Sequence, residues 1–286
     1  MDATRPPDDE QSQLWNGPSG RAWVEAQEVL DGMFKPIEDL LVEAVVASSA
    51  RQVLDIGCGT GSTTLAVARR LGTEGHCTGV DISAPMLDAA RARADREGTP
   101  ASFVRANAQL HAFEPAHYDM IISRFGVMFF EDPVQAFANL RRAARSDATL
   151  LAIAWRSPAD NPFMTTAERA AAPLLPDLPA RKPGAPGQFA FADANRVHRI
   201  LEDSGWAGID LQPVDVTCTL PEKELVRYLS RFGAVGRYLH EADERTRAQV
   251  IDTVRAAFGP FVHGPEVRYT AACWRIGARA PAAQGR

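Results

Sequence analysis

The fold of this chain is decided by one stretch, Val53-Leu54-Asp55-Ile56-Gly57-Cys58-Gly59-Thr60-Gly61. It starts as a short apolar run, places an acid near the end of that run and continues with three glycines at alternate positions. A helical pattern opens directly after it. A strand that turns sharply into a helix presents backbone N–H groups at the turn, and glycine lets a ligand approach that backbone closely. Asp55 would repel a phosphate there but could receive a positively charged amino group. The stretch therefore favours a nucleoside that carries an amino acid.

A second acid supports this interpretation. Asp81 stands at the carboxyl end of the next expected strand, residues 76–81. An acid about 20 residues beyond a glycine turn is where a doubly wound fold binds the hydroxyl pair of a ribose. One acid for an amino group and one for a ribose together fit S-adenosylmethionine. A nicotinamide dinucleotide site usually spaces its third glycine one residue further on and has no acid two residues before the first.

These motifs resemble those of the class I S-adenosylmethionine-dependent methyltransferases. Within that class the chain is most similar to the ubiquinone/menaquinone-biosynthesis type and its relatives that act on small molecules. The resemblance is carried by residues 53–61, 79–86, 105–109 and 118–130, and it extends over about 51–155. It implies an α/β fold with a doubly wound, mostly parallel seven-stranded sheet (a Rossmann-like methyltransferase fold) and a helical lid or insertion. It also implies that the last strand runs antiparallel between the fifth and the sixth.

The hydrophobic pattern along the chain agrees with this fold, because expected strands alternate with expected helices. Strands are expected at 52–56, 76–81, 102–106, 118–123, 149–155, 209–216 and 268–276. The expected organisation is an N-terminal tail and lid segment (1–35), a cofactor-binding core (36–156), a proline-rich lid (157–192), a second half of the core (193–277) with a helical insertion at 221–260, and a disordered tail (278–286).

Composition restricts the function. Of the 286 residues, 45% are hydrophobic, and the net charge of −5 provides no electrostatic footprint for a nucleic acid partner. No apolar run reaches the length of a membrane span, and the first residues read as neither a signal nor a transit peptide. The four cysteines show no paired spacing, which predicts reduced thiols in a cytoplasmic protein. No metal site is expected, and the oligomeric state stays open.

The resemblance assigns cofactor contacts residue by residue. Asp55 would bind the amino group, Asp81 the ribose and the glycine turn the methionyl part and the sugar edge. Relatives usually have Asp where this chain has Asn107, whose amide oxygen could still accept a hydrogen bond from adenine. The full expected set is Asp55, Gly57, Cys58, Gly59, Gly61, Asp81, Ile82, Met86, Asn107, Ala108, Gln109 and Ser123.

The acceptor side is less determined by the sequence. Arg124 follows the fourth expected strand and could clamp a carboxylate or phosphate of the acceptor, or form a structural ion pair. His111 and His117 are the candidate general bases, although either side chain could instead lie at the surface or only form contacts within a loop. The expected substrate residues are Trp15, Trp23, Phe125, Met128, Trp155, Asn161 and Phe163. The two tryptophans and residues 157–191 are expected to close over the cofactor cleft.

These features predict methyl transfer from S-adenosylmethionine to a small-molecule acceptor at O, C or N by in-line displacement. A sulfonium also permits elimination or intramolecular attack, so a lyase or cyclase on the same fold is an alternative. A non-catalytic protein that binds the cofactor is a further one.

Overall fold

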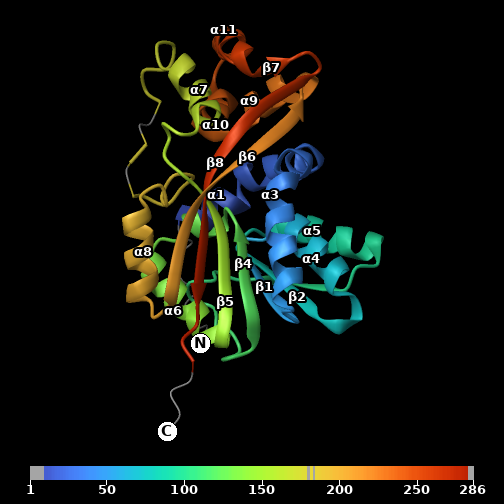
Figure 1. The fold of residues 1–286 in the computed structure, drawn as a ribbon. Coiled ribbons are helices and arrows are strands. Elements are labelled where there is room, and N and C mark those ends of the chain that lie inside the picture. The colour runs from blue at the N-terminus through green and yellow to red at the C-terminus, as the bar shows by residue number, and fades with distance from the viewer. Residues whose placement is uncertain (1–9, 179–180, 183, 283–286) are drawn as a thin grey trace, which may run out of the picture.

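The computed structural model describes residues 10–178, 181–182 and 184–282. Its centre is a twisted sheet with the strand order β3-β2-β1-β4-β5-β8-β6, and the short β7 pairs with β8 (Figure 1). Strands β1 to β5 are parallel, whereas β8 runs antiparallel between β5 and β6. This arrangement confirms the expected fold class and the place of the last strand. The strands are β1 (Gln52–Ile56), β2 (His76–Asp81), β3 (Ala101–Arg105), β4 (Tyr118–Arg124), β5 (Ala144–Trp155), β6 (Ala207–Pro221), β7 (Val262–His263) and β8 (Glu266–Arg279).

Helices cover both faces of the sheet (Figure 1). One face carries α3 (Gln27–Ser48), α4 (Ser62–Leu71) and α5 (Ala84–Glu97), and the other carries α6 (Pro133–Ala143) and α8 (Ala194–Asp203). Local sequence explains where they start: Asp132 and Asp193 accept hydrogen bonds from the first N–H groups of α6 and α8. The core between the layers is made of fully buried aliphatic side chains such as Leu54 and Ile121.

Two strands extend well beyond the sheet and carry a helical cap. β5 pairs with β8 only from Thr149 to Trp155, whereas β6 and β8 pair along their whole lengths. The cap consists of α7 (Pro162–Ala171), α9 (Leu225–Arg231), α10 (Gly233–Glu241) and α11 (Glu244–Ala257), at the far end of this ribbon (Figure 1). Its centre is aromatic, because Phe163 stacks on Tyr269 at 3.9 Å between ring centres. An insertion at 221–260 is expected from the sequence, but α7, from the proline-rich segment, is not.

The N-terminal region differs from the tail expected from the sequence. Residues 10–25 form two helices, α1 (Glu10–Asn16) and α2 (Pro18–Glu25). The side chain of Asn16 donates to the carbonyl of Ile82 at 3.2 Å and accepts from the N–H of Ala84 at 2.9 Å. These bonds hold α1 on the turn between β2 and α5. Residues 1–9 lie outside the described part of the chain.

Two expected boundaries are also corrected. Position 36 lies inside α3, which includes Pro36, so the core does not begin there. At the other end, β8 continues to Arg279, and the N–H of Ala280 donates to the carbonyl of Ala148 at 2.8 Å. Residues 278 and 279 therefore belong to β8 and Ala280 is bonded to β5, so these residues are not a disordered tail, while 283–286 lie outside the described residues. Among the described helices, none is long and apolar enough to cross a membrane.

Candidate functional site

A cavity of about 1160 Å³ opens at the carboxyl ends of the parallel strands. Its walls come from α1 and α2, from the turns after β1, β2 and β4, and from the cap. Pockets for a single small ligand usually measure roughly 300–1,000 Å³. The cavity can therefore hold a cofactor and a second small molecule together, at the edge where doubly wound folds bind ligands.

The three glycines of the turn have different structural roles, although all of them have positive φ. A Cβ at Gly57 would lie 2.6 Å from the Cα of Gly126, and one at Gly61 would lie 2.9 Å from the Cβ of Ala90. These two glycines are required by packing within the protein. A Cβ at Gly59 would meet only the sulfur of Met86, at 3.8 Å, and both residues line the cavity. Gly59 is thus the glycine of the turn whose open side faces the cavity.

Asp55 is a buried carboxyl group at the end of β1, with 1% of its surface exposed. Burial raises the pKa of Asp55 to about 6, although a hydrogen bond from Thr64 and the charge of Arg124 both lower it. The hydroxyl of Thr64 donates to Oδ2 at 2.7 Å. A buried carboxylate is costly unless a cation compensates it. A cationic ligand at this end of the cavity would supply that compensation.

Asp81 stands at the end of β2 and is held by the backbone around it. The N–H of Gly59 donates to Oδ2 and the N–H of Ser83 donates to Oδ1, both at 2.8 Å. The pKa of Asp81 lies above its ordinary value, because burial raises it by more than these N–H groups lower it. Each carboxylate oxygen can accept more than one hydrogen bond. Asp81 is therefore fixed in a geometry in which both oxygens could also accept from a pair of hydroxyls.

The other expected cofactor residues lie along the same wall. Ile82, Met86, Asn107, Ala108, Gln109 and Cys58 all line the cavity. Two of their side chains are also used locally: the Asn107 oxygen accepts from the N–H of Gln109 at 3.0 Å, and the Gln109 amide donates to the side chain of Gln135 at 2.7 Å. The thiol of Cys58 lies beside Gly79, and burial raises its pKa well above the ordinary value.

Ser123 is a correction to the expected cofactor set. Its side chain is fully buried and is not part of the cavity wall. The hydroxyl donates to the carbonyl of Ile56 at 2.8 Å and accepts from the N–H groups of Gly126 and Val127. Ser123 thus ties the turn after β4 to β1 and has no free capacity for a ligand.

The two histidines expected as candidate bases are also corrected. His111 packs its ring on Phe113 at 4.7 Å and does not line the cavity. His117 pairs with Glu114 at 3.1 Å, immediately before β4, at the opposite end of that strand from the cavity. The general ability of histidine to act as a base near neutral pH suggested both residues, but neither side chain lines the cavity.

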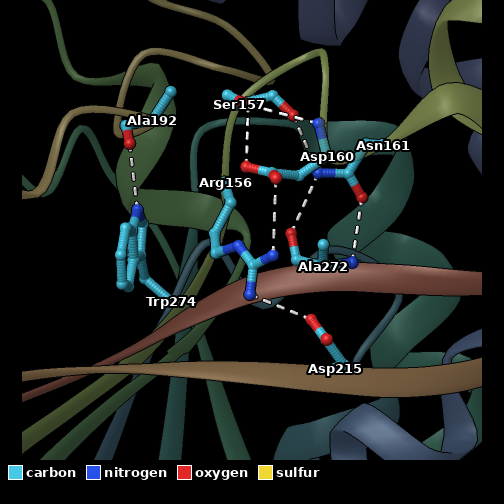
Figure 2. A network of polar contacts seen from close by, with 8 residues as sticks. All are labelled: Arg156, Ser157, Asp160, Asn161, Ala192, Asp215, Ala272 and Trp274. Atoms are coloured by element: carbon cyan, nitrogen blue, oxygen red, sulfur yellow. Dashed lines mark hydrogen bonds and ion pairs between the residues drawn. The ribbon is translucent and has the colours of Figure 1, made fainter.

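Six of the seven expected substrate residues line the cavity: Trp15, Trp23, Phe125, Met128, Trp155 and Phe163. Phe125 and Trp155 are stacked at 4.6 Å with an interplanar angle of 8°. Asn161 is the exception, because its amide donates to the carbonyl of Ala272 and its oxygen accepts from the N–H of the same residue, both at 2.9 Å (Figure 2). It fastens the start of α7 to β8, beside the ion pairs of Arg156 with Asp160 and Asp215.

Polar groups without partners mark the cavity as a ligand site. Among the described residues, five buried side-chain atoms have no hydrogen-bond partner, and three of them belong to residues that line the cavity: Gln11 Oε1, Thr63 Oγ1 and Arg124 Nη1. Buried polar atoms in folded proteins are nearly always paired. Sequence reasoning missed Gln11 and Thr63. The position of Thr63 in the first turn after the glycines is a signal that could have identified it.

Fold and site together define a doubly wound α/β protein with a ligand-sized cavity at the carboxyl ends of its parallel strands. Residues 53–147 match the family model described as a methyltransferase domain. An uncharacterized protein of Mycobacterium tuberculosis is 32% identical over 120 residues, which cover 42% of this chain and 43% of that protein. Demethylmenaquinone methyltransferase of Lactiplantibacillus plantarum is 32% identical over 121 residues, which cover 42% and 50%. These matches confirm the resemblance to small-molecule methyltransferases.

The matched region spans half or less of the length of these relatives. Solved structures agree over much more of the chain. The YcgJ protein of Bacillus subtilis has a TM-score of 0.55 at 16% identity and covers 87% of this chain and 98% of its own. The [4+2]-cyclase SpnF has a TM-score of 0.56 at 16% identity and covers 95% and 96%. At such identities the likeness shows that the fold is shared.

Proposed function

We propose that the protein transfers a methyl group from S-adenosylmethionine to a small-molecule acceptor. The observation that carries this proposal is Asp55, a carboxyl group buried at the end of a cavity where a cationic ligand would compensate its charge. When bound, S-adenosylmethionine supplies an activated methyl group and also a cationic amino group. Thus the cavity has both a place for this cofactor and room for an acceptor.

The residues present fit this cofactor. Asp55 would bind the amino group, Asp81 the ribose hydroxyls and Thr63 a further polar group near the methionyl part. The open side of Gly59 would let the cofactor approach the backbone. All of these residues lie within the matched methyltransferase domain, residues 53–147. The demethylmenaquinone methyltransferase of Lactiplantibacillus plantarum, which this segment resembles, supports a small-molecule acceptor.

The cap and the N-terminal helices supply the rest of the site. Trp23 of α2 meets Phe232, between α9 and α10, at 6.0 Å between ring centres, and Arg227 donates to the carbonyl of Glu25 at 2.7 Å. These contacts join the two segments over the cavity. Their role in the proposal is to exclude water and hold the acceptor in line, because methyl transfer depends mainly on positioning.

Calorimetry with S-adenosylhomocysteine tests the cofactor site, and incubation of S-adenosylmethionine with a panel of acceptors tests the reaction. Release of S-adenosylhomocysteine marks methyl transfer, whereas methylthioadenosine marks cleavage or cyclisation. Binding without either product would favour a non-catalytic role, and absence of binding would refute the proposal.

The four cysteines, all free and buried, are consistent with a reducing cytoplasm as the place of action, which cell fractionation would test.

A further inference from the structure

One guanidinium group in the cavity has an unsatisfied donor. Arg124 ends β4 and lines the cavity, with its guanidinium carbon 5.9 Å from the ring centre of Phe34. Its Nη1 is buried and has no hydrogen-bond partner among the described residues. A buried charged donor without an acceptor is destabilising, so such groups mark sites where a partner binds.

The other arginines of the cavity wall are not comparable. Arg181 donates to both carboxylate oxygens of Glu168 at 2.7 Å. Arg196 donates to the carbonyl of Ala190 at 2.7 Å, and Arg231 pairs with Glu25. Their positions are explained by the acceptors that they already have. Arg237 also lines the wall, but its side chain is exposed. Arg124 is therefore the arginine of the described wall whose buried, unpaired donor points to a ligand.

The surroundings of Arg124 are flat and apolar. Phe34 packs edge to face against Phe125 at 5.4 Å and against Trp155 at 6.3 Å, and these last two rings stack on each other. Phe125 is held at a φ of 68°, in the left-handed region that non-glycine residues rarely adopt. Its N–H donates to the carbonyl of Ile153 at 2.9 Å. The surrounding structure thus enforces an aromatic wall beside the guanidinium.

We propose that the acceptor combines a flat apolar body with a planar oxyanion, a carboxylate or an ionised acidic hydroxyl, that pairs with Arg124. This inference rests on the proposed function and deepens it by naming the acceptor class. A guanidinium presents its donors in a plane that matches a planar oxyanion, and aromatic faces suit a flat body. Such a pair would satisfy Nη1 and leave no unpaired charge beside Phe34.

The charges also set an order of binding. Arg124 and Asp55 attract each other in the free protein. A cofactor amino group would neutralise Asp55 and leave the positive field of Arg124 uncompensated. The oxyanion should therefore bind more tightly after the cofactor, and by linkage the cofactor more tightly after the oxyanion.

Matched probes test the pairing directly. Binding of 2-naphthoate and 2-naphthamide, and of 2,4-dinitrophenol and its methyl ether, is measured by calorimetry with and without saturating S-adenosylhomocysteine. We expect at least one anion to bind about tenfold or more tightly than its neutral partner, as for a charge-assisted hydrogen bond. The pair that shows the preference tells a carboxylate from an ionised hydroxyl.

The variants Arg124→Gln and Arg124→Lys remove the charge and the planar donor set respectively. Arg124→Gln should abolish the preference and Arg124→Lys should retain part of it. Arg156→Gln is the matched control, because Arg156 also lies 5.9 Å from an aromatic ring centre but is paired with Asp160 and Asp215 outside the cavity. It should keep the full preference.

Equal affinity for anion and neutral partner in the wild-type protein would overturn the inference, and so would an unchanged preference in Arg124→Gln. If Arg124→Gln does not fold, an unchanged preference in Arg124→Lys overturns it in the same way. Failure of S-adenosylhomocysteine to bind the wild-type protein would refute the proposed function instead. The naphthoate pair without that ligand would still test the pairing.

Discussion

Replacement of Asp55 by asparagine should stabilise the free protein and weaken cofactor binding at once. Burial raises the pKa of Asp55 to about 6, compared with about 3.9 in an unfolded chain. The folded protein therefore binds the extra proton more tightly than the unfolded one, and its stability falls as pH rises between these two values. The difference corresponds to about 3 kcal/mol of unfolding free energy.

The measurement is a comparison of urea unfolding between the wild-type protein and Asp55→Asn at pH 4 and pH 7. Near pH 4 the protonated acid and the amide should have similar effects, since both keep the bond from Thr64. By pH 7 the variant should have gained up to about 3 kcal/mol relative to wild type. In return, S-adenosylhomocysteine should bind about ten to a hundred times more weakly, because a charge-assisted bond is lost.

Asp119→Asn is a control of opposite sign. Burial tends to raise the pKa of Asp119, but the N–H groups of Gln52 and Arg51 and the charge of Arg145 lower it below the ordinary value. The wild-type carboxylate there should stabilise the protein above about pH 4 and lose this effect as pH falls further. Identical pH dependence in wild type and Asp55→Asn would refute the role assigned to Asp55.

Three further predictions concern the same cavity. Gly59→Ala should weaken S-adenosylhomocysteine binding about tenfold or more and cost about 1–2 kcal/mol of stability for its positive φ, whereas Gly61→Ala should lower the melting temperature further, because its Cβ would also lie 2.9 Å from the Cβ of Ala90; unchanged binding in Gly59→Ala, or an equal loss of melting temperature in both variants, would contradict the roles assigned to them. Asp81→Ala should weaken S-adenosylhomocysteine binding and also cost about 1–3 kcal/mol of unfolding free energy for each of the two N–H groups left unpaired. An unchanged affinity for S-adenosylhomocysteine, measured by calorimetry, would show that Asp81 is not part of the cofactor site. Trp23→Ala should raise amide exchange around Phe232 in the bound state, and unchanged exchange would show that this contact does not close the cavity.

The cofactor half of the fold could be predicted because its signals are local. The strands 52–56 and 76–81 have the bounds that the sequence predicts, and α4 begins directly after the glycine turn as the helical pattern there predicts. A glycine turn between an apolar run and a helical pattern depends on neighbouring residues only. The acids Asp55 and Asp81 could be found for the same reason, since Asp81 ends β2 and Asp55 is the residue before the end of β1.

The remainder depends on contacts between distant segments. Ser123 lies one residue before the end of β4, as Asp55 does in β1, and only the distance to the Ile56 carbonyl shows that its hydroxyl serves the backbone. Asn161 follows β5 like a site residue, yet its partner Ala272 lies 111 positions away. The helices α1 and α7 have weak patterns in the sequence, and their positions depend on distant segments: the turn after β2 for α1, and α11 and β8 for α7.

The two halves of the cavity have complementary electrostatics. Asp55 is a buried acid whose charge a cationic ligand would compensate, and Arg124 is a cation whose buried Nη1 an acceptor would satisfy. Neither residue is placed for stability, because each would be less costly at the surface. Proteins tolerate such costs at functional sites, where a ligand removes them on binding. A cationic cofactor and an anionic acceptor would relieve both costs together, and each would favour the binding of the other.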